Sequence, residues 1–158
     1  MNPSKPKWCR LIARPLRWLP GRMHSGGLSL MLNHLLAHAL ADGELDFLRS
    51  RVVSISVSDL HLSYRLVLGE QGFAAAPPGV PADVSFSGEA YTFLLLATQR
   101  EDADTLFFQR RLRIEGNTAL GLHLKNFLDA LGEPPLPGPA REALSRFTDL
   151  YARRCGTP

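Results

Sequence analysis

The fold of this chain is decided by residues 104–131, which read DTLFFQRRLRIEGNTALGLHLKNFLDAL. In this stretch Leu112 and Ile114 alternate with charged neighbours, which is the period of a strand with one buried and one wet face. A Gly-Asn pair then interrupts the strand, and Asn117 or Thr118 can cap a following helix. The stretch predicts a short helix, a strand, a turn and a long amphipathic helix, without any catalytic constellation.

Two segments, roughly residues 28–41 and 118–131, carry apolar residues at the period of an amphipathic helix. The apolar positions are Leu28, Leu32, Leu35, Leu36 and Ala39 in the first segment, and Leu120, Leu124, Phe127, Leu128 and Leu131 in the second. Gly132 and Pro134 supply the stop signal of the second helix. Each helix therefore offers one apolar face.

Between these helices the apolar period changes to two, which is typical of strands. Residues 53–57 and 62–68 alternate in this way around a turn at Asp59, residues 72–76 form a weaker third strand, and a fourth begins at Val84. Residues 44–48 are compatible with either the first helix or the sheet. Ser87 can cap a helix that runs to Gln99.

A Pro-rich linker precedes a last amphipathic helix, residues 140–154, which either packs on the domain or covers an opening in it. The inventory predicts an α+β fold, in which a sheet of about five strands has helices on one face. The other sheet face, rich in Ser and Arg, is expected to remain in water. The expected organisation is a basic arm (1–27), one domain (28–132) and a linker with the terminal helix (133–158).

The 158 residues, 45% hydrophobic and 21% charged, suit one globular domain and exclude a disordered or integral membrane protein. Residues 1–41 hold six cationic side chains and no acid, whereas the remainder holds 12 basic and 15 acidic residues. Prolines and arginines interrupt any signal-like apolar run in the arm. We expect a cytoplasmic protein, with its two cysteines, Cys9 and Cys155, reduced.

The basic arm mixes tryptophan and aliphatic side chains with its cations, which suits contact with an anionic lipid surface. The alternative is that the arm docks on the core and leaves its cations in solvent. The candidate membrane contacts are Lys7, Trp8, Arg10, Arg14, Arg17 and Trp18.

No motif in the chain predicts catalysis, a cofactor or a metal. His34 and His38 have the i, i+4 spacing of metal ligands, but they lie opposite the apolar stripe and no third ligand is nearby, which favours solvated histidines. The three arginines at 110, 111 and 113 are a weak signal for nucleic acid, because exposed aromatics are not interleaved with them and the body outside the arm is net acidic.

Two runs then indicate a family. ADVSFSG (82–88) and FQRRLRIEGN (108–117), each followed by a helix, resemble the strands of the sterol carrier protein type 2 family. Together with ADGELDFL (41–48) and KNFLDA (125–130), residues 104–122 are similar to its bacterial accessory factors of oxygen-independent ubiquinone biosynthesis. The resemblance covers roughly residues 28–131.

This resemblance implies a lipid-binding domain whose helices and sheet enclose an apolar tunnel, with no reaction of its own. It also implies an isoprenoid quinone ligand, two iron–sulfur partners that hydroxylate the quinone ring without oxygen, and a place at the inner membrane. The alternatives are a general phospholipid or fatty-acyl binder, and a scaffold that recruits protein or nucleic acid through its arm. The candidate tunnel-lining residues are Val53, Ile55, Leu62, Tyr64, Leu66, Val84, Phe86, Phe93, Leu96, Phe107, Leu112, Ile114, Leu120, Leu124 and Phe127.

Overall fold

The computed structural model describes residue 18 and residues 21–132 and 136–155. Five strands form one mixed sheet in the order β3-β2-β1-β4-β5, in which β1 and β4 are parallel and all other neighbours antiparallel. The strands are β1 (Val52–Val57), β2 (Leu62–Gly69), β3 (Gly72–Ala75), β4 (Val84–Gly88) and β5 (Arg113–Gly116). The helices are α2 (Gly21–Leu35), α3 (Ala37–Ala41), the 3-10 helix η1 (Asp46–Leu48), α4 (Ala90–Ala97), α5 (Ala103–Phe108), α6 (Thr118–Ala130) and α7 (Gly138–Cys155).

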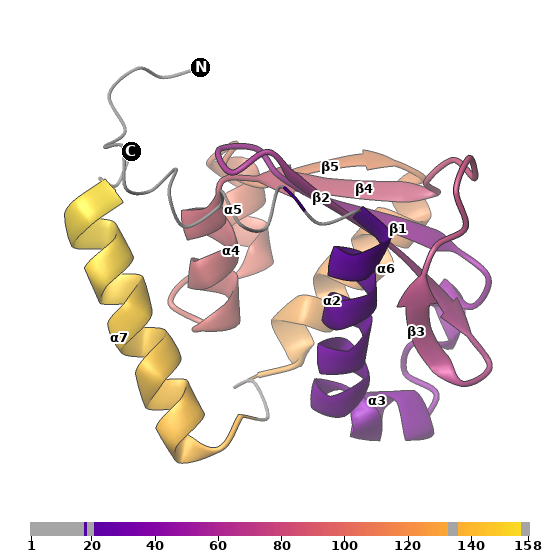
Figure 1. Ribbon diagram of the computed structural model, residues 1–158, viewed down its shortest axis with the longest axis horizontal. Helices are drawn as coiled ribbons and strands as arrows, with labels where there is room; N and C mark the ends of the chain where they lie inside the picture. Colours follow the sequence, from indigo (N-terminus) through magenta and orange to yellow (C-terminus); the bar gives the residue numbers. More distant parts are fainter. Residues whose placement is uncertain (1–17, 19–20, 133–135, 156–158) are drawn as a thin grey trace.

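The sheet forms one layer and helices α2 to α6 lie together beneath one of its faces (Figure 1). The register explains this, because Ile55 on the central strand β1 is paired with Tyr64 on β2 and with Phe86 on β4, and Phe86 is paired with Ile114 on β5. Paired residues share a face, so this row is apolar. The next row, Ser63, Ser56, Ser87 and Arg113, is polar and lies on the other face. The α+β prediction, with one covered and one polar face, is confirmed.

Helix α2 begins at Gly21, so the predicted start at Leu28 is wrong. The last residues of the expected basic arm (1–27), including Ser25, Gly26 and Gly27, therefore lie inside the helix. Ser25 is buried there because its Oγ accepts a 3.0 Å hydrogen bond from the Arg65 N–H of strand β2. A tertiary contact therefore offsets the weak helix propensity of the two glycines.

The same helix closes the edge of the sheet. The Asn33 side chain accepts from the Phe73 N–H through Oδ1 (2.7 Å) and donates to the Phe73 carbonyl through Nδ2 (2.9 Å). Asn33 thus takes the place of a neighbouring strand on β3, whose edge would otherwise offer unpaired backbone groups. The approach is close, since a Cβ on Gly72 (φ +109°) would lie 2.6 Å from Asn33 Oδ1.

Side-chain caps start the later helices. Asn117 Oδ1 accepts from the Leu120 N–H at 3.0 Å, which confirms one of the two predicted caps of α6. The prediction that Ser87 caps helix α4 is wrong. The N–H of Ala90, the first residue of this helix, donates instead to Asp59 Oδ1 at 2.8 Å. Hydrogen bonds from Thr105 cap α5 at Asp102 and lower the pKa of that carboxyl.

Residues 44–48, for which the sequence was compatible with either helix or sheet, contain the 3-10 helix η1 (Asp46–Leu48). Leu45 and Leu48 are buried in the core. Cys155 is disulfide-bonded, which contradicts the expectation of a reduced thiol at this position. Among the described helices, none has both the length and the apolar character needed to cross a bilayer.

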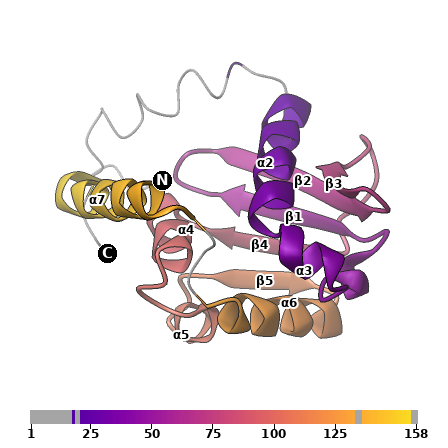
Figure 2. The same cartoon turned by 90° about the horizontal axis from the view of Figure 1, so that it is seen from below.

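Helix α7 stands at one end of the molecule and packs against α4 (Figures 1 and 2). Its Tyr151 ring stacks on Tyr91 of α4, and its hydroxyl donates to Asp59 Oδ2 at 3.0 Å. Burial, followed by the nearby Asp59 carboxylate, raises the pKa of Tyr151, so the phenol keeps the proton that it donates. Arg100 adds a 2.6 Å ion pair to Asp149 that lowers the pKa of this exposed carboxyl.

Replacement of Asn33 by alanine should lower the free energy of unfolding by about 2 kcal/mol, because it leaves the Phe73 N–H and carbonyl without partners. Urea denaturation of Asn33→Ala measures this loss. The control is His34→Ala, an exposed position on the same helix, which should change stability by less than about 0.5 kcal/mol. Equal losses in the two variants would contradict the edge-closing role.

Tyr151→Ala should detach helix α7, because it removes a buried aromatic side chain, a ring stack and a hydrogen bond, together about 3 kcal/mol or more. Hydrogen exchange should show that the amides of α7 lose protection while those of the sheet keep theirs. Phe147→Ala is the matched control, because Phe147 lies on the same helix but its side chain is 43% exposed, whereas that of Tyr151 is 5% exposed. Unchanged protection of α7 in Tyr151→Ala would refute this docking contact.

Candidate functional site

The first candidate site is the apolar interior between the sheet and the helices. Side chains from the strands, from α2, α4, α5 and α6 and from the 39–48 segment form one continuous cluster there. Twelve of the fifteen predicted lining residues belong to it: Val53, Ile55, Leu66, Val84, Phe86, Phe93, Leu96, Leu112, Ile114, Leu120, Leu124 and Phe127.

The structure does not bring the other three predicted lining residues into this cluster. Leu62 is buried outside it, near the turn between β1 and β2. Tyr64 is half-buried with its ring edge-on to His24, and burial raises the pKa of its phenol. Phe107 lies at the surface, 41% exposed, with its ring against Phe108.

The helices pack more extensively on the outer strands of the apolar face than on its middle. Helix α2 packs on strands β2 and β3, and helix α6 on β4 and β5, while β1 has its extensive contacts only with its neighbouring strands. Figure 2, a view from below, shows α2 and α6 beneath the same face of the sheet but near its opposite edges. As a result Ile55, at the centre of the central strand and on the helix-covered face, is only half-buried.

Large apolar side chains of helices α4 and α6 border the cluster. Phe93 and Leu96 come from α4, and Leu124 and Phe127 from α6, and all four are packed against the cluster while remaining half-buried. Together with Ile55 they are the candidate residues for contact with an apolar ligand.

Two residues that the sequence did not single out position the helices around this centre. One is Asn33, described above. The other is Gly121, where a Cβ would lie 2.8 Å from the Cγ2 atom of Ile114, so glycine lets α6 approach strand β5 closely. The signal available in the sequence was a glycine on the apolar stripe of a strongly periodic helix, three positions before Leu124.

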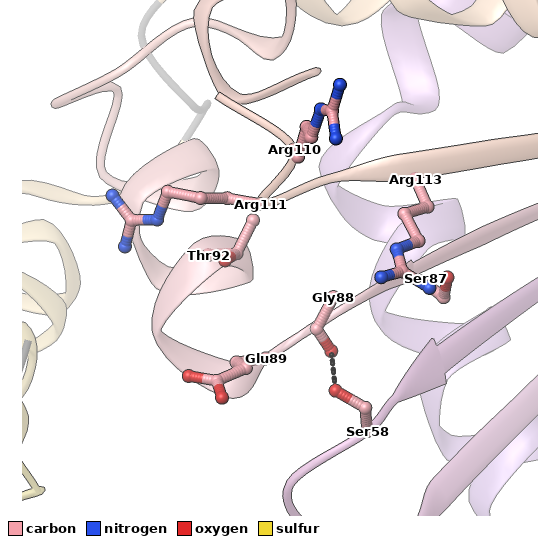
Figure 3. A pocket seen from close by; sticks show the side chains of 8 residues that line it. All are labelled: Ser58, Ser87, Gly88, Glu89, Thr92, Arg110, Arg111 and Arg113. Carbon is pink, nitrogen blue, oxygen red and sulfur yellow. Dashed lines mark hydrogen bonds between the residues drawn. The ribbon is translucent and has the colours of Figure 1, made fainter. Parts of the chain in front are cut away.

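The second candidate site is a polar pocket of about 400 Å³ at the end of the sheet (Figure 3). It was not foreseen, because the three nearby arginines were weighed only as a nucleic-acid signal. Its lining residues come from the turn after β1, the end of β4, the start of α4, the α5–β5 connection and the first residue of β5: Ser58, Ser87, Gly88, Glu89, Thr92, Arg110, Arg111 and Arg113.

The remaining candidate residues give no site. His34 and His38 are exposed, and no group of three metal-ligating side chains occurs in the described part of the chain. Trp18 is 91% exposed. The other candidate membrane contacts, Lys7, Trp8, Arg10, Arg14 and Arg17, lie outside the described residues.

The structure defines an α+β domain in which helices cover the apolar face of a five-stranded mixed sheet. The model of the SCP-2 sterol transfer family matches residues 32–129. The chain belongs to this family.

Among curated proteins, the chain is 39% identical over 140 residues to the ubiquinone biosynthesis accessory factor UbiT of Escherichia coli K12, which covers 89% of this chain and 80% of that protein. UbiT of Escherichia coli O157:H7 matches to the same extent. Among solved structures, UbiJ-SCP2, a ubiquinone synthesis protein, superimposes with a TM-score of 0.54 at 19% identity, covering 66% of this chain and 91% of that one. This likeness concerns the fold.

Proposed function

We propose that this protein is a non-enzymatic accessory factor of oxygen-independent ubiquinone biosynthesis. It binds isoprenoid quinone, either ubiquinone or its biosynthetic intermediates, and presents it to the enzymes that hydroxylate the ring. The observation that carries the proposal concerns Ile55, which lies at the centre of the apolar sheet face that the helices cover. Its side chain is only half-buried. The similarity to UbiT supports the choice of ligand.

The physical need for such a carrier follows from the ligand. Removing an aliphatic tail from water is favourable by about 0.8 kcal/mol per CH₂, so a polyprenyl tail does not enter water unaided. A tail laid over Ile55 and beneath Phe93 and Phe127 exchanges water for apolar side chains on both sides. The ring, which has polar oxygens, is then free to remain at the mouth of the site.

The partners in this proposal are the iron–sulfur hydroxylases UbiU and UbiV, which act on a ring that the carrier exposes. The quinone itself resides in the membrane, so the carrier works at the inner membrane from the cytoplasmic side. Its basic arm, with Trp18 fully in solvent, supplies the peripheral contact.

Lipid extraction tests the proposal directly. The protein purified from bacteria should release isoprenoid quinone into organic solvent, and it should bind added quinone in preference to phospholipid. Ile55→Phe should fill the space above β1 and lower quinone binding about tenfold or more, with little change in the free energy of unfolding. Mass spectrometry of the extract and urea denaturation measure the two effects.

Val53→Phe is the matched control, because Val53 lies on the same strand and face but is only 5% exposed. A larger ring there should overpack the core and cost about 1 to 3 kcal/mol. If Ile55→Phe destabilises the fold as much as Val53→Phe, the centre is solidly packed and the proposed site does not exist. Preferential binding of phospholipid would instead identify a general lipid carrier.

For the membrane contact, deletion of residues 1–20 should weaken binding to anionic liposomes, because the deletion removes five cationic side chains near the lipid surface. Added salt should weaken binding of the full chain in the same direction through screening. Co-sedimentation with phosphatidylglycerol vesicles measures both effects, with phosphatidylcholine vesicles as the control. Binding that neither change alters would show that the arm is not the contact.

A further inference from the structure

The polar pocket is separate from the apolar interior. Its residues Ser87 and Arg113 lie in the row of the sheet that faces away from the helices, whereas Phe86 and Ile114, one position along each strand, face the interior. Strand alternation therefore places Ser87 and Arg113 on the face of β4 and β5 opposite to Phe86 and Ile114, while Glu89 and Thr92 join the pocket from the start of helix α4. The pocket has no part in the proposed quinone site.

The pocket is cationic. Three arginines and one glutamate line it, which leaves a formal charge of +2. The three arginines lie within four positions of the chain, and Figure 3 shows their guanidinium groups extending in different directions around the pocket. The structure gives one of them, Arg111, a neighbouring carboxylate, that of Glu101 at 3.9 Å.

Arg110 and Arg113 have no ion pair or hydrogen bond from their side chains to any residue in the described ranges 21–132 and 136–155. Arg113 is the cross-strand partner of Ser87, and in Figure 3 its side chain lies over β4 beside that serine. Arg110 has φ +60°, the left-handed conformation that ends helix α5, where the Arg111 and Leu112 N–H groups donate to the Leu106 carbonyl.

Arg111 and Glu89 behave differently from these two arginines. Arg111 lies over the Tyr91 ring with its guanidinium 5.4 Å from the ring centroid. Figure 3 shows its guanidinium and the Glu89 carboxylate extending away from Ser58 and Arg113. The single carboxylate of the lining therefore does not neutralise the cations on the side of the serines.

We propose that this pocket binds a phosphate group. A guanidinium offers paired N–H donors that match two phosphate oxygens, and two such groups without a competing carboxylate provide the charge. The hydroxyl of Ser87 offers a further donor, while the Thr92 side chain is buried and the Ser58 hydroxyl already donates to the Gly88 carbonyl at 3.1 Å. The volume of about 400 Å³ admits a phosphate or diphosphate with part of the molecule that carries it.

The phosphate group has two sources, a soluble phosphate compound or a lipid headgroup. Phe107 and Phe108, separated from Arg110 only by Gln109, are exposed, as aromatic side chains at a membrane surface often are. The experiment therefore has one arm for each source. Pyrophosphate is the soluble probe, and phosphatidylcholine vesicles with or without phosphatidylglycerol are the lipid probe.

The full-length chain should bind at least one of these probes saturably at low salt, and the double variant R110Q/R113Q should lose about tenfold or more of that affinity. Calorimetry measures pyrophosphate binding and co-sedimentation measures vesicle binding. Both arginines are exposed at their side chains, and a thermal melt confirms that the variant is folded.

The control variant R49Q/R146Q removes the same charge from exposed arginines outside the pocket. It should keep the affinity, and R110K/R113K should restore part of it. Loss confined to the pyrophosphate arm assigns a soluble ligand, and loss confined to the vesicle arm assigns a headgroup. The proposal is overturned if neither probe binds, or if the control variant loses as much affinity as R110Q/R113Q. Neither arm uses quinone, so a failure here is distinct from a failure of the carrier function.

Discussion

The position of helix α2 is the constraint on which the rest of the interior depends. Polar side chains on this helix, Ser25 and Asn33, hydrogen-bond to backbone groups of strands β2 and β3. Such bonds have fixed directions, unlike apolar contacts, so they hold the helix over the edge of the sheet and prevent it from sliding toward the centre. Residual apolar surface over β1 is a consequence of this anchoring.

Helix α6 is held on the opposite side by a different set of contacts. Gly121 lets its backbone approach β5, Asp129 accepts a 2.8 Å hydrogen bond from the Ala103 N–H, and Lys125 pairs with Asp104 of α5. Both helices are thus attached to outer strands and neither is free to close over Ile55. The contacts that fix the two helices therefore favour the outer strands over the centre of the sheet.

Local periodicity was enough to predict the elements whose stability comes from one buried face. The alternation at Val84 and Phe86 and the stripe that begins at Leu120 are examples, and both were placed correctly. The failures share a cause, because the Ser25 bond to Arg65 spans 40 positions and the Asp59 cap of α4 spans 31. A helix that is started or extended by a distant partner leaves no local pattern.

The same alternation explains how one short stretch serves two surfaces of unlike chemistry. Leu112 and Ile114 contribute to the apolar interior, while Arg111 and Arg113 line the polar pocket. Strand β4 contributes to both surfaces in the same way, since Phe86 belongs to the apolar cluster and the next residue, Ser87, lines the pocket. The alternation of a strand is thus sufficient to place unlike side chains on two surfaces without any additional segment.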